Sequence, residues 1–188
     1  MERDKIIFGA YVGLLFIFIL LVALTPYIAF SDKGSASNLY TAFAATCHQK
    51  ISRSLCLFEN GGIGDCTNQS GVYVNDDRSV VSVKKDGVLG FKFPVCARDI
   101  GIYGAMLLGA LAYPFVFKLD ELKFLPPIIL VLAIVPIGLD GGIQFLSDVG
   151  INLIGNYEST NLIRLITGGI AGFVASFFVI PILNRMFG

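Results

Sequence analysis

The sequence predicts an all-α integral membrane protein with four transmembrane helices and one long extracytoplasmic loop. Of its 188 residues, 55% are hydrophobic and only 15% are charged, whereas a soluble domain carries about 25% charged residues. The mean hydropathy is +0.74. Four apolar runs are each close to the roughly 20 residues that cross a bilayer as a helix. We expect residues 1–188 to form a single membrane domain.

The charges exclude one class of partner. Fourteen Lys and Arg residues balance fourteen Asp and Glu residues, so the formal net charge is zero. Binding to nucleic acid is driven largely by an excess of basic residues that neutralise phosphates. We therefore expect no nucleic-acid partner, and the expected partner is the lipid bilayer.

The first predicted span covers residues 6–30, which contain no charged side chain. A cleavable signal peptide has a shorter apolar region of about 7–15 residues and ends in small residues. This run is longer and ends in the sequence Tyr27-Ile28-Ala29-Phe30. It is therefore interpreted as a retained membrane anchor.

Three further spans are predicted in the second half of the chain. Residues 100–117 are uncharged, residues 124–146 contain only Asp140, and residues 162–183 contain only Arg164. Backbone polar groups in lipid must be paired within their own segment, so each run is expected to be helical. Small residues at four-residue spacing, such as Gly168 and Gly172, are expected to let helices approach closely.

The basic residues predict the orientation, because Lys and Arg of short connecting segments favour the cytoplasm. Five of them fall on one side of a four-span arrangement: Arg3, Lys5, Lys118, Lys123 and Arg185. Residues 152–161 contain none. The prediction is a multi-pass protein of the cell membrane with both termini in the cytoplasm. Residues 31–98 then form an extracytoplasmic loop.

Two elements are predicted within this outer loop. Residues 39–58 lack Gly and Pro and carry apolar residues at near-helical spacing, which indicates an amphipathic helix on the membrane surface. Residues 71–93 alternate valines with polar residues around Asp86-Gly87. This pattern is typical of a β-hairpin, because Asp-Gly supplies the positive φ that a tight turn needs.

All four cysteines lie in the outer loop, where an oxidising environment permits disulfides. Cys56 and Cys66 flank a glycine-rich turn, and we expect them to form a structural disulfide. Such a bond contributes about 2–3 kcal/mol. Asn68-Gln69-Ser70 also matches the N-glycosylation pattern, a triplet that often arises by chance.

Two predicted spans carry polar side chains that lipid does not solvate. Asp140 lies one turn from Gln144, and Arg164 lies one turn from both Asn161 and Thr167. A charge near the bilayer centre costs about 3 kcal/mol or more, so it must face protein or water and find a partner. Asp140 and Arg164 are the natural partners of each other.

The same level of the membrane is expected to hold Cys96, Arg98 and Asp99, which open the second span. The sequence thus predicts a polar site in the outer third of the membrane, built from residues of separate spans. The alternative is a network of ion pairs and hydrogen bonds that only locks the helices together.

Four outer residues suggest a metal site: Cys47, His48, Cys96 and Asp99. Two sulfurs, one imidazole and one carboxylate suit tetrahedral zinc, although adjacent Cys and His ligands are geometrically awkward. One alternative is an exchangeable Cys47–Cys96 disulfide, with Arg53 or Arg98 lowering a thiol pKa. Another is a plain structural disulfide between the same cysteines.

Four motifs carry a family resemblance. They are C-H-Q-K-x-x-R-S (residues 47–54), P-V-C-A-R-x-x-G-I-Y (94–103), D-G-x-x-Q (140–144) and N-x-x-R-x-x-T-G (161–168). Together they resemble a prokaryotic family of small predicted membrane proteins catalogued as a domain of unknown function. Asp99 departs from the cysteine common in that family, which argues against a cysteine-only cluster here. The resemblance implies a shared polar cluster on the outer face and no established activity.

The leading hypothesis is a metal-binding or thiol-dependent membrane enzyme acting on a lipid-borne or envelope substrate. Its site combines the metal ligands above with Asp140 as base or orienting carboxylate, and with Arg98 and Arg164 as anion-binding groups. Arg53, Gln144 and Asn161 complete it. The alternatives are a transporter or ion-pathway subunit, which with four spans would need to form a homo-oligomer, and a structural or assembly protein.

Overall fold

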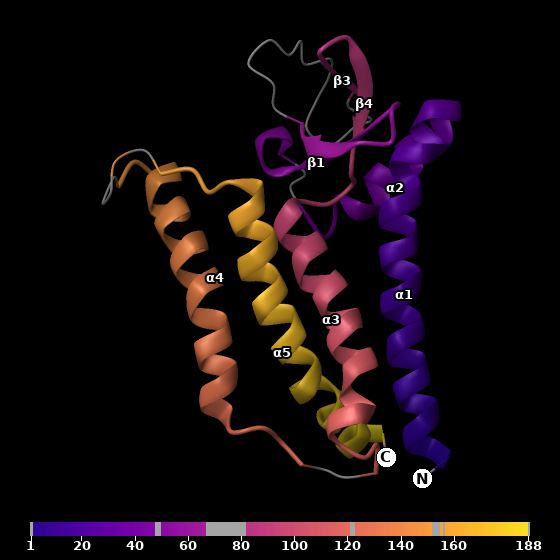
Figure 1. Ribbon diagram of the computed structural model, residues 1–188, viewed down its shortest axis with the longest axis vertical. Helices are drawn as coiled ribbons and strands as arrows, with labels where there is room; N and C mark the ends of the chain where they lie inside the picture. The colour runs from indigo at the N-terminus through magenta and orange to yellow at the C-terminus, as the bar shows by residue number, and fades with distance from the viewer. Residues whose placement is uncertain are drawn as a thin grey trace. The chain divides into compact units, whose positions relative to one another are not determined.

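The computed structural model describes residues 2–47, 50–66, 82–120, 123–151, 155 and 157–187. Four helices are long and apolar enough to cross a membrane: α1 (Glu2–Ser31), α3 (Ala97–Val116), α4 (Pro127–Asp148) and α5 (Asn161–Phe187) (Figure 1). Each contains most of one predicted apolar run, so the four helical segments are confirmed. Their apolar side chains are largely left uncovered by protein, and Phe115 is 91% exposed. Apolar surface of this extent suits contact with lipid.

The chain divides into two compact units. The first unit contains Met1–Ile17 and Ile100–Gly188, and the second contains Phe18–Asp99. Each unit has its own buried core: Leu15, Tyr113 and Phe177 belong to a core of the first. Cys56 and Val83 belong to a core of the second.

In the first unit, α3 and α5 approach closely because glycines face the neighbouring backbone. A Cβ atom added at Gly172 would lie 2.1 Å from the carbonyl oxygen of Ile102, and one at Gly101 would lie 2.5 Å from that of Leu165. Ser176 on α5 donates a hydrogen bond to the carbonyl oxygen of Met106 on α3, at 2.6 Å. The packing role predicted for Gly172 is confirmed, and Gly101 plays the same role on α3.

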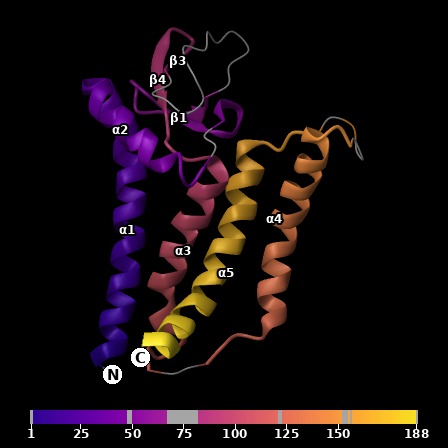
Figure 2. The same ribbon diagram turned by 180° about the vertical axis from the view of Figure 1, so that it is seen from behind.

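The first unit also gathers several basic segments at one end. Asn184 near the end of α5 donates a 2.8 Å hydrogen bond to the carbonyl oxygen of Leu119, in the connection between α3 and α4. The start of α1 and the end of α5 line a common groove. Figures 1 and 2 accordingly show both termini at the same end of the helices. The segments that carry Arg3, Lys118 and Arg185 therefore lie together.

The second unit joins the end of α1 to the short helix α2 (Lys33–Phe43) and a sheet. Asp32 caps α2 by accepting hydrogen bonds from the backbone of Gly34 at 2.9 Å and the hydroxyl of Ser35 at 2.5 Å. These two bonds lower the pKa of the Asp32 carboxyl, with that from Ser35 the larger cause. The cap explains why a new helix starts directly after α1 ends.

The sheet has four antiparallel strands in the order β2-β1-β4-β3. They are β1 (Leu55–Phe58), β2 (Ile63–Asp65), β3 (Ser82–Lys85) and β4 (Val88–Lys92). Asp86 and Gly87 join β3 to β4 with φ values of 50° and 83°. This turn and the pairing of Lys85 with Val88 confirm the predicted hairpin over its described part. Residues 71–81 of that prediction lie outside the described residues.

The predicted amphipathic helix over residues 39–58 is right only as far as Phe43 and wrong over the described residues beyond it. Helix α2 ends at Phe43, a 3-10 turn covers Ile51–Arg53, and Leu55–Phe58 is a central strand. That strand pairs with β2 on one side and β4 on the other, so both of its edges are hydrogen-bonded. Its four apolar residues fit a buried strand as well as a helix, and the pairing decides between them.

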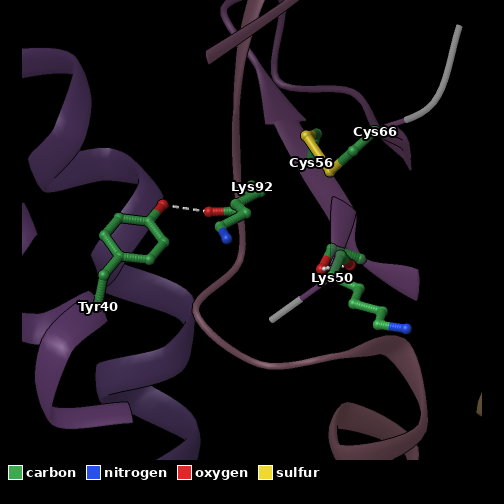
Figure 3. The surroundings of a disulfide bond; sticks show 6 residues. Tyr40, Lys50, Cys56, Cys66 and Lys92 are labelled. Atoms are coloured by element: carbon green, nitrogen blue, oxygen red, sulfur yellow. Dashed lines mark hydrogen bonds between the residues drawn. A yellow bond between two sulfur atoms is a disulfide. The ribbon is translucent and has the colours of Figure 1, made fainter. Parts of the chain in front are cut away.

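The predicted disulfide is confirmed: the sulfurs of Cys56 and Cys66 are bonded at 2.18 Å. Figure 3 shows this bond beside a second link, in which the Tyr40 hydroxyl donates a hydrogen bond to the carbonyl oxygen of Lys92. That bond joins α2 to β4, and both residues are fully buried. Burial also raises the pKa of Tyr40, so its hydroxyl stays a donor at neutral pH.

The close approach of α3 and α5 is testable with a matched pair of glycine substitutions. Gly172→Ala should lower the free energy of unfolding by about 1–3 kcal/mol, because its methyl group overlaps backbone that must move. Gly104→Ala on α3 meets open space and should be neutral or stabilising by up to about 1 kcal/mol. Thermal unfolding in detergent checks both, and equal effects would contradict the packing.

The disulfide should stabilise the second unit. The double variant Cys56→Ala/Cys66→Ala should lose about 2–3 kcal/mol of stability, because the open chain gains conformational freedom on unfolding. Denaturant unfolding of the wild type with and without a reductant provides the control. A wild type that loses nothing when reduced would contradict the prediction.

Candidate functional site

Three of the four predicted metal ligands come together in the second unit. The ligand atoms of Cys47, Cys96 and Asp99 all lie within 4.8 Å of one another, and all three residues are partly buried. The Cys96 thiol donates a hydrogen bond to Oδ2 of Asp99 at 3.1 Å. The fourth predicted ligand, His48, lies outside the described residues. We call Cys47, Cys96 and Asp99 the thiol–carboxylate cluster.

Local structure places each member of this cluster. The backbone N–H of Cys47 donates to the carbonyl oxygen of Phe43 at 3.2 Å, so Cys47 ends the turn that follows α2. Cys96 follows the sheet directly, since the N–H of Phe93 donates to the carbonyl oxygen of Leu55 at 2.8 Å. Asp99 lies in the first turn of α3, where the helix dipole favours a carboxylate.

The surroundings of Cys96 raise the pKa of its thiol. The hydrogen bond with Cys47 is the largest cause, followed by burial and then the charge of Asp99. This is the opposite of the lowering expected from Arg53 or Arg98, so Cys96 does not resemble an activated thiolate nucleophile. The structure also contains Cys47 and Cys96 as thiols rather than as a disulfide.

The cluster has the composition of a transition-metal site. Zinc takes thiolate sulfur at about 2.3 Å and carboxylate oxygen at about 2.0–2.2 Å. Ligand atoms around one tetrahedral ion are then about 3.3–3.8 Å apart, so groups already within 4.8 Å reach that geometry through small side-chain rotations. Two soft sulfurs favour zinc over calcium or magnesium.

The first unit holds a second group of polar side chains, four of them buried on α4 and α5 and one, Tyr157, partly exposed in the connection before α5. We call it the α4–α5 polar cluster; its members are Asp140, Gln144, Tyr157, Asn161 and Arg164. The Tyr157 hydroxyl donates to Oδ1 of Asp140 at 2.9 Å. Nη1 of Arg164 donates to Oδ1 of Asn161, also at 2.9 Å. Arg164 is 1% exposed and Asp140 is 6% exposed, so both are removed from lipid.

Two further contacts extend this cluster. Nη2 of Arg164 lies 3.9 Å from Oε1 of the exposed Glu158, in the connection that precedes α5. The Thr167 hydroxyl donates to the carbonyl oxygens of Ile163 and Arg164, within its own helix. The predicted common face of Asn161, Arg164 and Thr167 is confirmed. The single site that would combine this cluster with Cys96, Arg98 and Asp99 stays a prediction.

Sequence reasoning missed Tyr157 and Lys92. Tyr157 precedes α5 in a polar segment, where a tyrosine is ordinary, so only the fold reveals its bond to Asp140. That bond is the largest cause of the raised pKa of Tyr157. Lys92 is fully buried, with its amino nitrogen 5.8 Å from the centre of the Tyr40 ring. No signal in a hairpin sequence distinguishes such a lysine from an exposed one.

Comparison with known proteins shows the family to which the chain belongs. Residues 87–178 match the model of the family described as "Predicted membrane protein (DUF2085)". The chain is also 34% identical over 178 residues to the uncharacterized protein MJ1492 of Methanocaldococcus jannaschii, covering 90% of this chain and 88% of that protein. No solved structure matches the chain. It belongs to this family of predicted membrane proteins, as the motifs indicated.

The Tyr157–Asp140 bond predicts a pH dependence. The pKa of Tyr157 is raised above its ordinary value of 10.0, so the stabilisation is fully present below that pH and is lost as the pH rises through the raised pKa. Tyr157→Phe should cost about 1 kcal/mol at neutral pH. Unfolding of both proteins at a series of pH values should give a constant difference from about pH 7 to about pH 9 and a smaller one in stronger alkali. A stability difference that already decreases between about pH 7 and about pH 9 would contradict the stabilising role of the Tyr157–Asp140 hydrogen bond.

Proposed function

We propose that this membrane protein binds one transition-metal ion, with zinc the preferred metal, through Cys47, Cys96 and Asp99. One observation carries the proposal: a ligand atom from each of these residues lies within 4.8 Å of the other two. The three residues come from two segments about fifty positions apart in the sequence. Their meeting is therefore a product of the fold rather than of sequence proximity.

The number of protein ligands indicates what kind of metal site this would be. Three protein ligands leave one tetrahedral position for water or a substrate, as in catalytic zinc sites, whereas four ligands close a structural site. His48 follows Cys47 directly, and adjacent residues rarely bind one ion together. The three-ligand arrangement therefore favours an open site, suited to hydrolytic chemistry on a lipid-borne or envelope substrate.

We further propose that the thiol–carboxylate cluster faces the extracytoplasmic side. Basic segments of the first unit lie together at the end that contains both termini, and basic segments favour the cytoplasm. The Cys56–Cys66 disulfide belongs to the same unit as the cluster. A disulfide persists where the environment is oxidising, as it is outside the cytoplasm.

For the α4–α5 polar cluster we propose a stabilising role. Its hydrogen bonds join Tyr157 to Asp140 on α4, and Asn161 to Arg164 on α5. Bonds of this kind stabilise polar groups that lipid would leave unsolvated. A substrate-binding or ion-conducting role for Asp140 and Arg164 would need a ligand beyond these internal partners.

Metal analysis of the purified full-length protein tests the zinc proposal. The wild type, incubated with zinc and then dialysed, should retain about one ion per chain. Cys47→Ser, Cys96→Ser and Asp99→Asn should each reduce zinc affinity by at least about tenfold. Asp86→Asn, an exposed carboxylate in the β3–β4 turn, is the matched control and should retain zinc. Cobalt binding should also give a thiolate-to-cobalt absorption band in the wild type and a weaker band in Cys47→Ser and in Cys96→Ser, because each of these variants keeps one sulfur ligand.

Two results would overturn the zinc proposal. Full zinc retention after Cys47→Ser and after Cys96→Ser would overturn the proposal, and so would a wild type that binds neither zinc nor cobalt. Retained far-ultraviolet circular dichroism shows that a variant is folded. If Cys96→Ser fails to fold, Asp99→Asn and the cobalt spectrum of the wild type decide instead. His48→Ala separates a closed site, which loses zinc, from an open one.

A further inference from the structure

A groove runs between the start of α1 and the end of α5, within the first unit. Its volume is about 470 Å³, and its walls include Ile7, Ala10 and Leu14 from α1, with Val179, Leu183 and Phe187 from α5. That volume lies within the roughly 300–1,000 Å³ of small-ligand pockets. The walls are almost wholly apolar, so an occupant must itself be hydrocarbon over most of its length.

The length of the groove matches one leaflet of a bilayer. Its α1 wall extends from Ile6 to Leu14, about 12 Å along a helix axis. Half of the hydrocarbon core is about 15 Å thick. The groove begins at the helix ends and extends toward the middle of the span, which is the path of an acyl chain.

A basic residue, Arg3, lies at the end of the groove nearest the N-terminus. Residues 3, 7, 10 and 14 follow the four- and three-residue steps that share one helix face, so Arg3 continues the α1 wall one turn beyond Ile7. Arg3 is exposed. Arg185 in the last turn of α5 lies two residues from both Leu183 and Phe187, on the opposite face of that helix, and does not extend the wall. Glu2 and Asp4 lie on the flanking faces of the same turn of α1. Of the charged residues in this turn, Arg3 is therefore the one in line with the groove wall.

We propose that this groove binds one acyl chain of an anionic phospholipid whose phosphate contacts Arg3. The apolar walls fit the chain, and the arginine complements the charge of the headgroup. Basic pockets between transmembrane helices bind anionic lipid headgroups for the same reason. The proposal is independent of the metal site, which involves other residues in the other unit.

Native mass spectrometry of the full-length protein in detergent tests this inference. The probes are dioleoyl-phosphatidylglycerol, which is anionic, and dioleoyl-phosphatidylcholine, which has the same chains and no net charge. The wild type should retain one molecule of the anionic lipid about fivefold more strongly than the neutral one. Arg3→Gln should remove that preference.

Two variants should fill the groove with a larger side chain. Ala10→Phe and Val179→Phe should each lower the retention of both lipids about tenfold, the loss expected from roughly two displaced CH₂ groups. Lys5→Gln removes a charge from the opposite face of α1 and should change nothing. Val131→Phe adds the same side chain on an exposed face of α4 and is the control for added bulk.

The same mass spectra would also show the results that contradict the proposal. Equal retention of the two lipids by the wild type would overturn the proposal, as would lipid binding unchanged in both Ala10→Phe and Val179→Phe. A dimer that disappears in Ala10→Phe would mean that a second copy of the chain, and not lipid, covers the groove. Zinc content should stay at the wild-type level in all these variants, so this test and the metal test fail independently.

Discussion

The hydrocarbon core of a membrane offers no hydrogen-bond partner, and most features of this protein answer that constraint. The four long helices pair their own backbone groups. Where α3 and α5 meet, glycines let backbone pack on backbone, and the Ser176 hydroxyl donates a hydrogen bond to the carbonyl oxygen of Met106. Asp140 and Arg164, the charged side chains within the predicted apolar runs, are almost completely buried beside polar neighbours.

The second unit differs from the first in its secondary structure and in its cysteine side chains. It contains an antiparallel sheet, a disulfide and a capped helix, and its four cysteines fall into two pairs. Cys56 and Cys66 form a disulfide that joins β1 to the residue after β2. Cys47 and Cys96 are not joined in a disulfide and lie beside a carboxylate, so each could lose its proton and bind a metal ion as a thiolate.

Sequence reasoning succeeded where one local rule decides the structure. Apolar length predicted the four helices, and Asp86-Gly87 predicted the hairpin turn. It failed at Leu55–Phe58, because an apolar run of four residues fits a helix or a strand until distant strands pair with it. It predicted that Cys96 and Asp99 lie together, as they do, but it missed Tyr157, since only the folded α4–α5 connection brings that hydroxyl to Asp140.

X-ray absorption at the zinc edge of the zinc-loaded, full-length protein tests the metal site most directly. The account predicts two sulfur neighbours at about 2.3 Å and lighter oxygen or nitrogen neighbours at about 2.0 Å. The sulfur signal should fall to one neighbour in Cys47→Ser protein that retains residual zinc. A first shell made only of oxygen and nitrogen, or one of four sulfurs, would contradict a site built from Cys47, Cys96 and Asp99.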